Sequence, residues 1–146
     1  MVTVISKIRY IDTSVAFRVS SRESLAAETW LDQDIQSGAQ YFSSQLLRTE
    51  LIWAYRRSGK DLAEAIEFIH LIAMLDLDNE LATEATNLEP LVKTLDALHL
   101  ATALRLAKLL PVTVITHDAQ MARAAKQLGL AAHDPVTDDP NRGPVA

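Results

Sequence analysis

The sequence predicts an α/β domain with a mostly parallel central sheet, and three observations support this fold class. Short apolar runs of strand length alternate with longer segments whose apolar residues recur at the helical period. Most of the helical segments start at a Ser, Thr or Asp that can cap a helix, and several stop near a glycine or a proline. Strands and helices that alternate along one chain are typical of a sheet whose strands run parallel.

Each expected strand is a short run of β-preferring residues with a turn or a helix cap beside it. We expect strands over residues 7–12, 40–43, 74–77, 112–116 and 130–133. We expect helices over residues 24–37, 44–57, 61 onward, 78–88, 94–109 and 118–128. Thr94 is expected to cap the longest apolar helix and Pro111 to stop it, while Asp12-Thr13-Ser14 is interpreted as a turn or a helix cap. The strands at 7–12 and 112–116 are expected in the centre of the sheet, because central parallel strands are apolar.

The composition fits one domain. The chain has 146 residues, of which 49% are hydrophobic, so a sizeable core is available. We expect the domain to span residues 1–135 and a flexible tail to occupy 136–146, where prolines and polar residues concentrate. No eighteen-residue apolar run and no signal-peptide apolar region is found, so neither a membrane span nor secretion is expected. The lack of cysteine excludes disulfides and thiolate zinc sites and fits a reducing cytoplasm.

Four acidic residues lie where a carboxylate is costly: Asp12, Glu50, Asp96 and Asp118. Asp12 and Asp118 follow expected strands, Asp96 lies in the first turn of an apolar helix, and Glu50 lies on an apolar helix face. Ligands of open parallel sheets bind at the carboxyl ends of the strands, so we expect the four acids to converge there. No Lys or Arg is adjacent to Asp12, Asp96 or Asp118, so a divalent metal is the leading explanation for their placement.

Each acid also has a purely structural interpretation. Asp118 is a suitable N-cap, Asp12 an ordinary turn residue, and Asp96 a stabilising acid in a first helical turn. Glu50 can pair with an arginine on its own helix. His99 lies on the same helix side as Asp96 and is interpreted as a core or interface histidine, with support of the acidic site as the alternative. Hydroxyl side chains that suit either the site or local capping are Thr13, Ser14 and Thr116.

The segments around the four acids resemble the PIN-domain ribonucleases, and among them the VapC toxins of bacterial toxin–antitoxin pairs. Asp12-Thr13-Ser14 is similar to the family's opening strand-end motif, and Glu50 to its helical glutamate. Residues 95–103, Leu-Asp-Ala-Leu-His-Leu-Ala-Thr-Ala, are similar to the family's most specific motif. The strand, acid and helix over 116–130 are similar to its closing block, and the resemblance covers about residues 7–135.

The resemblance implies a three-layer α/β/α, Rossmann-like domain that cleaves RNA with Mg²⁺, or alternatively Mn²⁺. It implies catalytic roles for the four acids, with Asp12, Asp96 and Asp118 as metal ligands and a metal-activated water as the nucleophile. It also implies a cognate VapB-like antitoxin and a homodimer. An apolar surface around Trp53, Tyr55 and a helix over 62–75 is expected to serve these contacts. The net charge of −5 is acidic for an RNA enzyme, and phosphate contacts are expected from Arg48, Arg56 and Arg57.

A metal-dependent phosphatase or phosphotransferase of another α/β type is the alternative, because acids at strand ends also serve that chemistry. That class usually carries Asp-x-Asp after its first strand, whereas Thr13 and Ser14 follow Asp12 here. A binding module without catalysis is disfavoured because all four acids are present. A P-loop or dinucleotide site is disfavoured because the four glycines form no glycine-rich loop. The residues do not indicate whether transfer, ribosomal or messenger RNA is cut.

Overall fold

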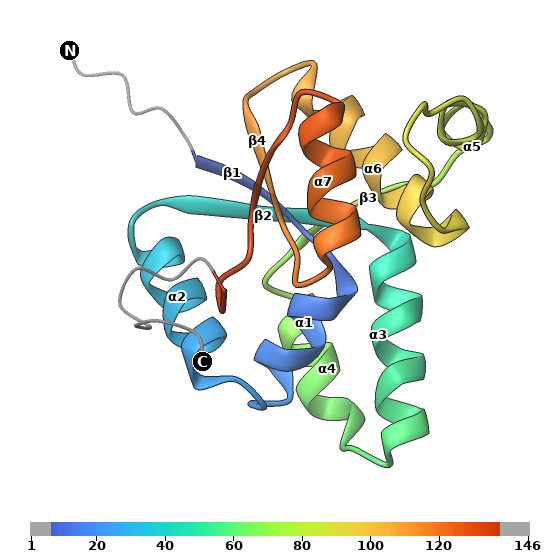
Figure 1. Ribbon diagram of the computed structural model, residues 1–146. Helices are drawn as coiled ribbons and strands as arrows, with labels where there is room; N and C mark the ends of the chain where they lie inside the picture. Colours follow the sequence, from blue (N-terminus) through green and yellow to red (C-terminus); the bar gives the residue numbers. More distant parts are fainter. Residues whose placement is uncertain (1–6, 138–146) are drawn as a thin grey trace.

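The computed structural model describes residues 7–137 (Figure 1), so most of the tail expected over 136–146 lies outside the described residues. Its strands form one five-stranded sheet in the order β3-β2-β1-β4-β5, and every neighbouring pair is parallel. The strands are β1 (Lys7–Ile11), β2 (Ala39–Ser44), β3 (Ala73–Leu75), β4 (Val112–Ile115) and β5 (Ala131–His133). The predicted parallel sheet is therefore confirmed, with β1 in its centre and β4 beside it.

Seven helices within the described residues cover the two faces of the sheet (Figure 1). They are α1 (Thr13–Ser20), α2 (Leu25–Gln36), α3 (Gln45–Ser58), α4 (Leu62–Ile69), α5 (Asn79–Thr86), α6 (Thr94–Ala107) and α7 (Ala119–Gln127). One buried cluster joins the sheet to α1, α2, α3 and α4, and a second joins it to α6 and α7. Helix α5 packs on α6. The arrangement is the three-layer α/β/α fold that the sequence predicts.

The period-two pattern of the central strands explains why both faces of the sheet are covered. In β1, Ile8 and Tyr10 enter the cluster under α6 and α7, whereas Ile11 enters the cluster under α1 to α4. In β4, Val114 and Ile115 divide in the same way. A strand that is apolar on both faces needs a helical layer on each side. The carboxyl ends of β1 and β4 consequently emerge together, with Tyr10 paired with Val114 and Ile11 with Ile115.

Several element boundaries differ from the sequence expectation. Thr94 is the first residue of α6 rather than its cap, because Lys93 is the last extended residue and makes no side-chain capping bond. Helix α6 ends at Ala107 instead of 109, ahead of the Pro111 break. Helix α4 ends at Ile69, earlier than the helix that was expected to reach residue 75, and the strand expected over 74–77 is found as β3 over Ala73–Leu75.

Helix α1 is the element that the sequence analysis missed. Only a turn or a cap was expected at Asp12, since Val15 and Val19 are β-branched and weak helix formers. Asp12 does act as the N-cap, and both valines are buried in the core. Tertiary packing therefore outweighs local propensity. Among the helices of residues 7–137, none combines the length and apolar content needed to cross a bilayer.

Candidate acidic active site

Asp12 lies at the carboxyl end of β1 and is 5% exposed. Its Oδ1 accepts hydrogen bonds from Ser14 Oγ at 2.6 Å and from the Val15 N–H at 3.3 Å. Its Oδ2 accepts a hydrogen bond from Thr116 Oγ1. Burial raises the pKa of the Asp12 carboxyl, and these hydrogen bonds oppose that shift without cancelling it. Asp12 is thus a buried carboxylate held in one orientation by hydroxyl groups.

The hydroxyl groups of Ser14 and Thr116 also bind the backbone of the β4–α7 connection. Ser14 Oγ accepts the His117 N–H at 3.1 Å, and Thr116 Oγ1 accepts the Asp118 N–H at 3.0 Å. Each hydroxyl therefore donates to Asp12 and accepts from the backbone, which uses both of its hydrogen-bonding roles. The sequence left Ser14 and Thr116 open between site and capping roles, and the structure makes them the supports of Asp12.

Glu50 lies on α3 and reaches the start of α1. Its Oε1 accepts a hydrogen bond from Thr13 Oγ1 at 2.8 Å and lies 2.7 Å from His99 Nε2. Burial alone would raise the pKa of Glu50, but the contacts with His99 and Thr13 outweigh it and lower the pKa below its usual value. The alternative expectation of an arginine partner is wrong, since the ion pair that the structure shows for Glu50 is with His99.

His99 is 2% exposed and connects two elements of the site. The ring nitrogen that faces Glu50 carries the hydrogen, because an ionised carboxylate only accepts. The other nitrogen, Nδ1, lies 2.7 Å from the Tyr10 hydroxyl, which is itself buried. The interpretation of His99 as only a core histidine is therefore incomplete, because the buried ring also orients Glu50. Tyr10 was not singled out, and only its strand position, two residues before Asp12, pointed to it.

Asp96 differs from the other three acids because it has no partner. It lies in the first turn of α6 and is half-buried, and its carboxylate makes no hydrogen bond or ion pair with the part of the chain that the structure describes. Burial raises the pKa of the Asp96 carboxyl, and the negative charges of Asp118, Asp12 and Glu50 raise it further. This coupling means that the four carboxylates share one electrostatic environment at the sheet edge.

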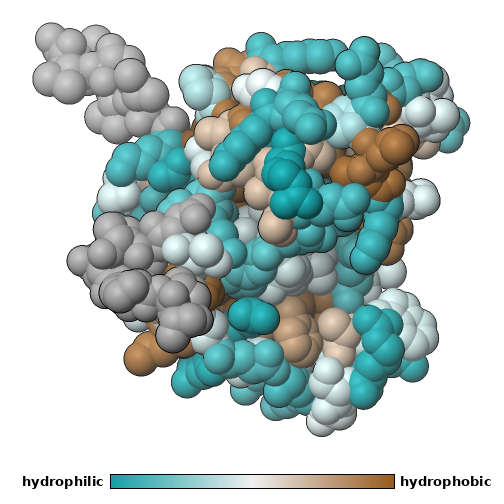
Figure 2. All heavy atoms as spheres, in the orientation of Figure 1, coloured by the Kyte–Doolittle hydropathy of each residue, from teal (hydrophilic) through white to brown (hydrophobic). Residues whose placement is uncertain are grey.

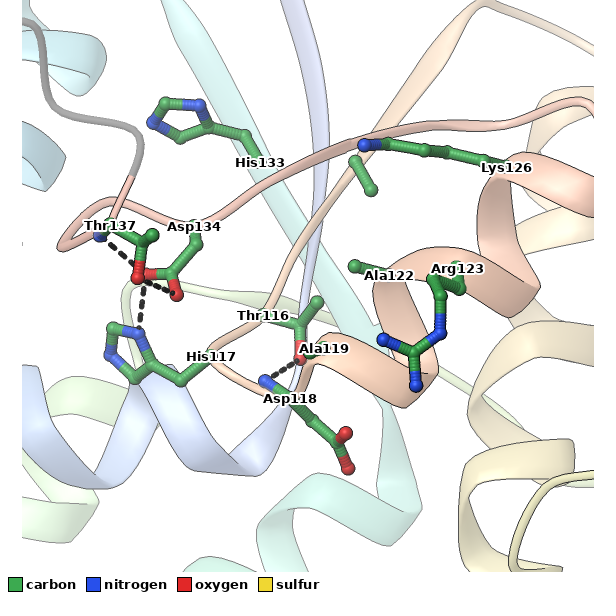
Figure 3. A pocket seen from close by; sticks show the side chains of 11 residues that line it. Thr116, His117, Asp118, Ala119, Ala122, Arg123, Lys126, His133, Asp134 and Thr137 are labelled. Carbon is green, nitrogen blue, oxygen red and sulfur yellow. Dashed lines mark hydrogen bonds and ion pairs between the residues drawn. The ribbon is translucent and has the colours of Figure 1, made fainter.

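Asp118 is the N-cap of α7, as its structural interpretation predicts. Its Oδ1 accepts the Gln120 N–H at 2.9 Å and the Met121 N–H at 3.3 Å. None of the hydrogen bonds shown for residues 7–137 uses Oδ2. The neighbouring His117 points away from this carboxylate, toward Asp134 (Figure 3), and its Nδ1 lies 2.8 Å from Asp134 Oδ1. Asp118 can therefore cap its helix and still present an oxygen to the acidic site.

The four acids suit a divalent cation that retains much of its water. Between residues 7 and 137, no three Asp, Glu or His side chains approach closely enough to surround an ion on their own. Mg²⁺ does not require such a cage, since one or two carboxylates and several waters commonly hold it. The unpartnered Asp96, with its pKa raised by neighbouring acids, lacks the positive charge that such an ion provides. The donor set therefore fits Mg²⁺ or Mn²⁺.

The basic residues expected to contact RNA lie on the exposed side of α3. Arg56 lies over the ring of Trp53, 4.1 Å from its centroid, and both Arg56 and Arg57 belong to the last turn of the helix. At 1.5 Å per residue, that turn is roughly 10 Å along the helix from Glu50. Their role in phosphate binding, like that of Arg48, stays a prediction.

The family model of the PIN domain matches residues 9–127, which include all four acids. The chain belongs to the PIN-domain family, and within it to the VapC-type ribonucleases. Ribonuclease VapC35 of Mycobacterium tuberculosis is 31% identical over 133 residues, which cover 86% of this chain and 96% of that protein. The resemblance stated from the sequence motifs is therefore confirmed.

Solved structures show the same fold at low sequence identity. VapBC2 from Rickettsia felis, bound to a DNA fragment from its promoter, has a TM-score of 0.69 at 13% identity, covering 87% of this chain and 98% of that chain. A toxin–antitoxin complex from Klebsiella pneumoniae has a TM-score of 0.62 at 15% identity, with coverages of 87% and 97%. VapC20 of Mycobacterium tuberculosis, a toxin that cleaves the sarcin–ricin loop, has a TM-score of 0.60 at 14% identity, with coverages of 80% and 94%.

Proposed function

We propose that the protein is a magnesium-dependent endoribonuclease that acts as the toxin of a VapBC pair. The observation that carries the proposal is Asp96, a half-buried carboxylate without a partner whose pKa three other acids raise. Burial and the neighbouring negative charges make this carboxylate costly to the fold, whereas a bound cation would compensate its charge. PIN-family membership favours this proposal over the phosphatase alternative.

In this proposal Asp12 and Asp96 are the principal metal ligands, and Asp118 completes the set directly or through water. A bound Mg²⁺ supplies positive charge for the phosphate and lowers the pKa of a nearby water. The protein's own groups keep the carboxylates in place: Ser14 and Thr116 orient Asp12. Mn²⁺ is the other ion that the oxygen ligands suit.

Glu50 is the fourth catalytic acid of the proposal. Because His99 and Thr13 lower the pKa of Glu50, its carboxylate remains ionised at neutral pH and is a weak general base. We therefore assign Glu50 the role of a fixed negative charge that orients water, held by a buried histidine that Tyr10 positions.

The proposed partners are an RNA substrate, a VapB-like antitoxin and a second copy of the chain, in the cytoplasm where RNA is available. Two of the similar solved structures are toxin–antitoxin assemblies. A cluster of uncompensated carboxylates attracts a cation, so an antitoxin is expected to insert a basic side chain into the acidic site.

Exposed apolar side chains supply a surface for the protein contacts. Trp53 is 47% exposed and Ile66 on α4 is 44% exposed. Tyr55, which the sequence analysis included in this surface, is instead fully buried, and its hydroxyl donates to Ser20 Oγ at 2.7 Å. Light scattering tests the homodimer, and a strict monomer at micromolar concentration would refute it.

The test of the activity incubates the purified protein with total RNA, with Mg²⁺ and with EDTA. We expect cleavage with Mg²⁺ and none with EDTA, and no cleavage of DNA. The Asp96→Asn variant is the matched control, since it removes one charge at nearly constant shape. Cleavage that persists in EDTA, or in a folded Asp96→Asn variant, would contradict the metal mechanism.

A further inference from the structure

A cavity of about 290 Å³ lies between α7 and the end of β5, next to the acidic site (Figure 3). Thr116 and Asp118 line it, so it begins where the acidic site ends. Arg123 and Lys126 extend from α7 on one side, and the end of β5 with Asp134 forms the other. Its volume lies near the lower limit for ligand pockets, roughly 300 Å³, which suits a phosphate with its sugar.

The two cations of this cavity have no partner. Arg123 and Lys126 are three residues apart, so they project from the same face of α7. Both are exposed, and neither side chain makes an ion pair or a hydrogen bond with any residue between 7 and 137. By contrast, Arg9 and Arg105 are paired with aspartates. Figure 2 shows hydrophilic residues over the face that α7 presents.

Neither carboxylate at the cavity neutralises its cations: Asp134 is hydrogen-bonded to other groups, and Asp118 points elsewhere. Asp134 accepts hydrogen bonds from the N–H groups of Val136 and Thr137 and from the Thr137 hydroxyl, besides its contact with His117. Burial alone would raise the pKa of Asp134, but these donors outweigh it and lower the pKa. The Asp118 carboxylate points away from His133 and Lys126 (Figure 3). The cations that face the cavity are therefore free to meet an anion.

We propose that this cavity is a phosphate subsite, where Arg123 and Lys126 hold the nucleotide phosphate next to the bond that is cut. The inference rests on the proposed ribonuclease function and extends it, because it directs the RNA across α7 rather than along α3. Thr116 and Asp118 line the cavity, so a phosphate held by these cations would lie beside two residues of the acidic site. The subsite also explains how a chain with a negative net charge binds RNA, because two local cations contact the phosphate beside the acidic site.

The experiment measures binding of a short fluorescent single-stranded RNA to the Asp96→Asn protein, which keeps the RNA intact. On that background, Arg123→Gln/Lys126→Gln is compared with Arg18→Gln/Lys108→Gln, which removes the same charge outside the cavity. We expect the α7 pair to weaken binding about tenfold or more and to reduce the salt slope by about 1.4, at roughly 0.7 per phosphate contact. The control pair should change the slope little.

Equal losses in the two variants would overturn the subsite, because the effect would then be net charge alone. A larger loss for Arg56→Gln/Arg57→Gln would also overturn it and place the RNA on α3. Titration with inorganic phosphate, followed by NMR at the Arg123 and Lys126 amides, tests the cavity without RNA. If the wild-type protein cleaves RNA, and Arg123→Gln/Lys126→Gln with Asp96 intact binds and cleaves RNA normally, the subsite alone fails. If the wild-type protein cleaves no RNA, but inorganic phosphate changes the NMR chemical shifts of the Arg123 and Lys126 amides, the proposed function alone fails.

Discussion

Two buried or half-buried aspartates, Asp34 and Asp96, show opposite solutions to the same problem. Asp34 receives two hydrogen bonds from Arg9, at 2.8 and 2.9 Å, and a third from the Tyr41 hydroxyl at 2.7 Å. Burial alone would raise the pKa of Asp34, but Arg9 and Tyr41 outweigh it and lower the pKa. Asp96 has no such partner, and burial together with neighbouring acids raises its pKa.

The difference separates a group that stabilises the fold from a group that is available for function. Removing one partner of a buried ion pair leaves the other charge without compensation and without water. The pair of Asp34 with Arg9 therefore contributes to stability. Removing the charge of Asp96 relieves repulsion, so its carboxylate costs stability. Asp96 is destabilising by itself, and the fold places it near three other acids from β1, α3 and α7. Such a group is expected in an active site.

The largest effect is expected for Asp96→Asn. Cleavage of RNA should fall by at least about 100-fold, the scale seen when a group that stabilises transition-state charge is removed. The thermal unfolding temperature should stay the same or rise, since repulsion at the acidic site decreases. Rates from a single-turnover assay and a melting curve check both parts. An unfolded variant would instead mean that Asp96 is a structural acid.

Asp34→Asn should produce the reverse pattern. We expect a loss of about 2 kcal/mol in the free energy of unfolding, below the roughly 3–5 kcal/mol of fully buried pairs, because Arg9 retains some exposure. Activity per folded molecule should stay near that of the wild type. Denaturant unfolding with an active-site titration measures the two quantities. Loss of activity without loss of stability would remove the contrast between the two aspartates.

Thr116→Val removes the hydroxyl that donates to Asp12 and accepts from the Asp118 N–H. The free energy of unfolding should decrease by about 1–3 kcal/mol, because a buried acceptor loses its donor. Cleavage should fall about 10- to 100-fold, as for other groups that orient metal ligands. Thr116→Ser, which keeps the hydroxyl, should recover most of the activity. Failure of Thr116→Ser to do so would assign Thr116 to packing.

The smallest effect concerns the pH dependence of stability in metal-free buffer. The folded-state pKa of Asp96 is raised, so its favourable contribution is present below the unfolded pKa and is lost as pH rises through the folded pKa. Asp96→Asn should thus be more stable than the wild type at pH 7, with the difference vanishing below about pH 3.9, the ordinary value for Asp. Asp34 has the opposite sign: its contribution is present at pH 7 and is lost as pH falls through its lowered pKa. Urea melts of both variants across pH 3–7 measure the signs, and identical profiles would contradict the argument.

Much of the fold was accessible from the sequence because its signals are local. Ser44 and Asp61 cap the helices that they were expected to cap, and Gly59 takes the left-handed conformation that ends α3. Helix α1 was missed because its two valines favour strands, and only the tertiary core makes it a helix. The end of α4 was misplaced, although a strand after it was expected, because an apolar run does not distinguish the last turns of a helix from a short strand.

The acids of the candidate site were visible for a different reason: carboxylates at strand ends and in apolar helices stand out against their neighbours. The groups that support them were visible only in part: Ser14 and Thr116 were candidates for the site, but their contacts with Asp12 and the role of Tyr10 were not predicted. Tyr10 reaches His99 across 89 positions and Thr116 reaches Asp12 across 104, so no sequence period links them. The free cations of α7 were missed as well, because the sequence does not say which arginines and lysines find a partner.

The central claim is that the unpartnered Asp96 and its neighbouring acids hold a divalent cation. Titration of the protein with Mn²⁺, followed by electron paramagnetic resonance, measures this directly, without RNA. The account predicts one bound ion in the wild type and in Asp34→Asn, and binding at least about tenfold weaker in Asp96→Asn, as when a ligand shell is disturbed. Equal binding by wild type and Asp96→Asn, with both folded, would contradict it.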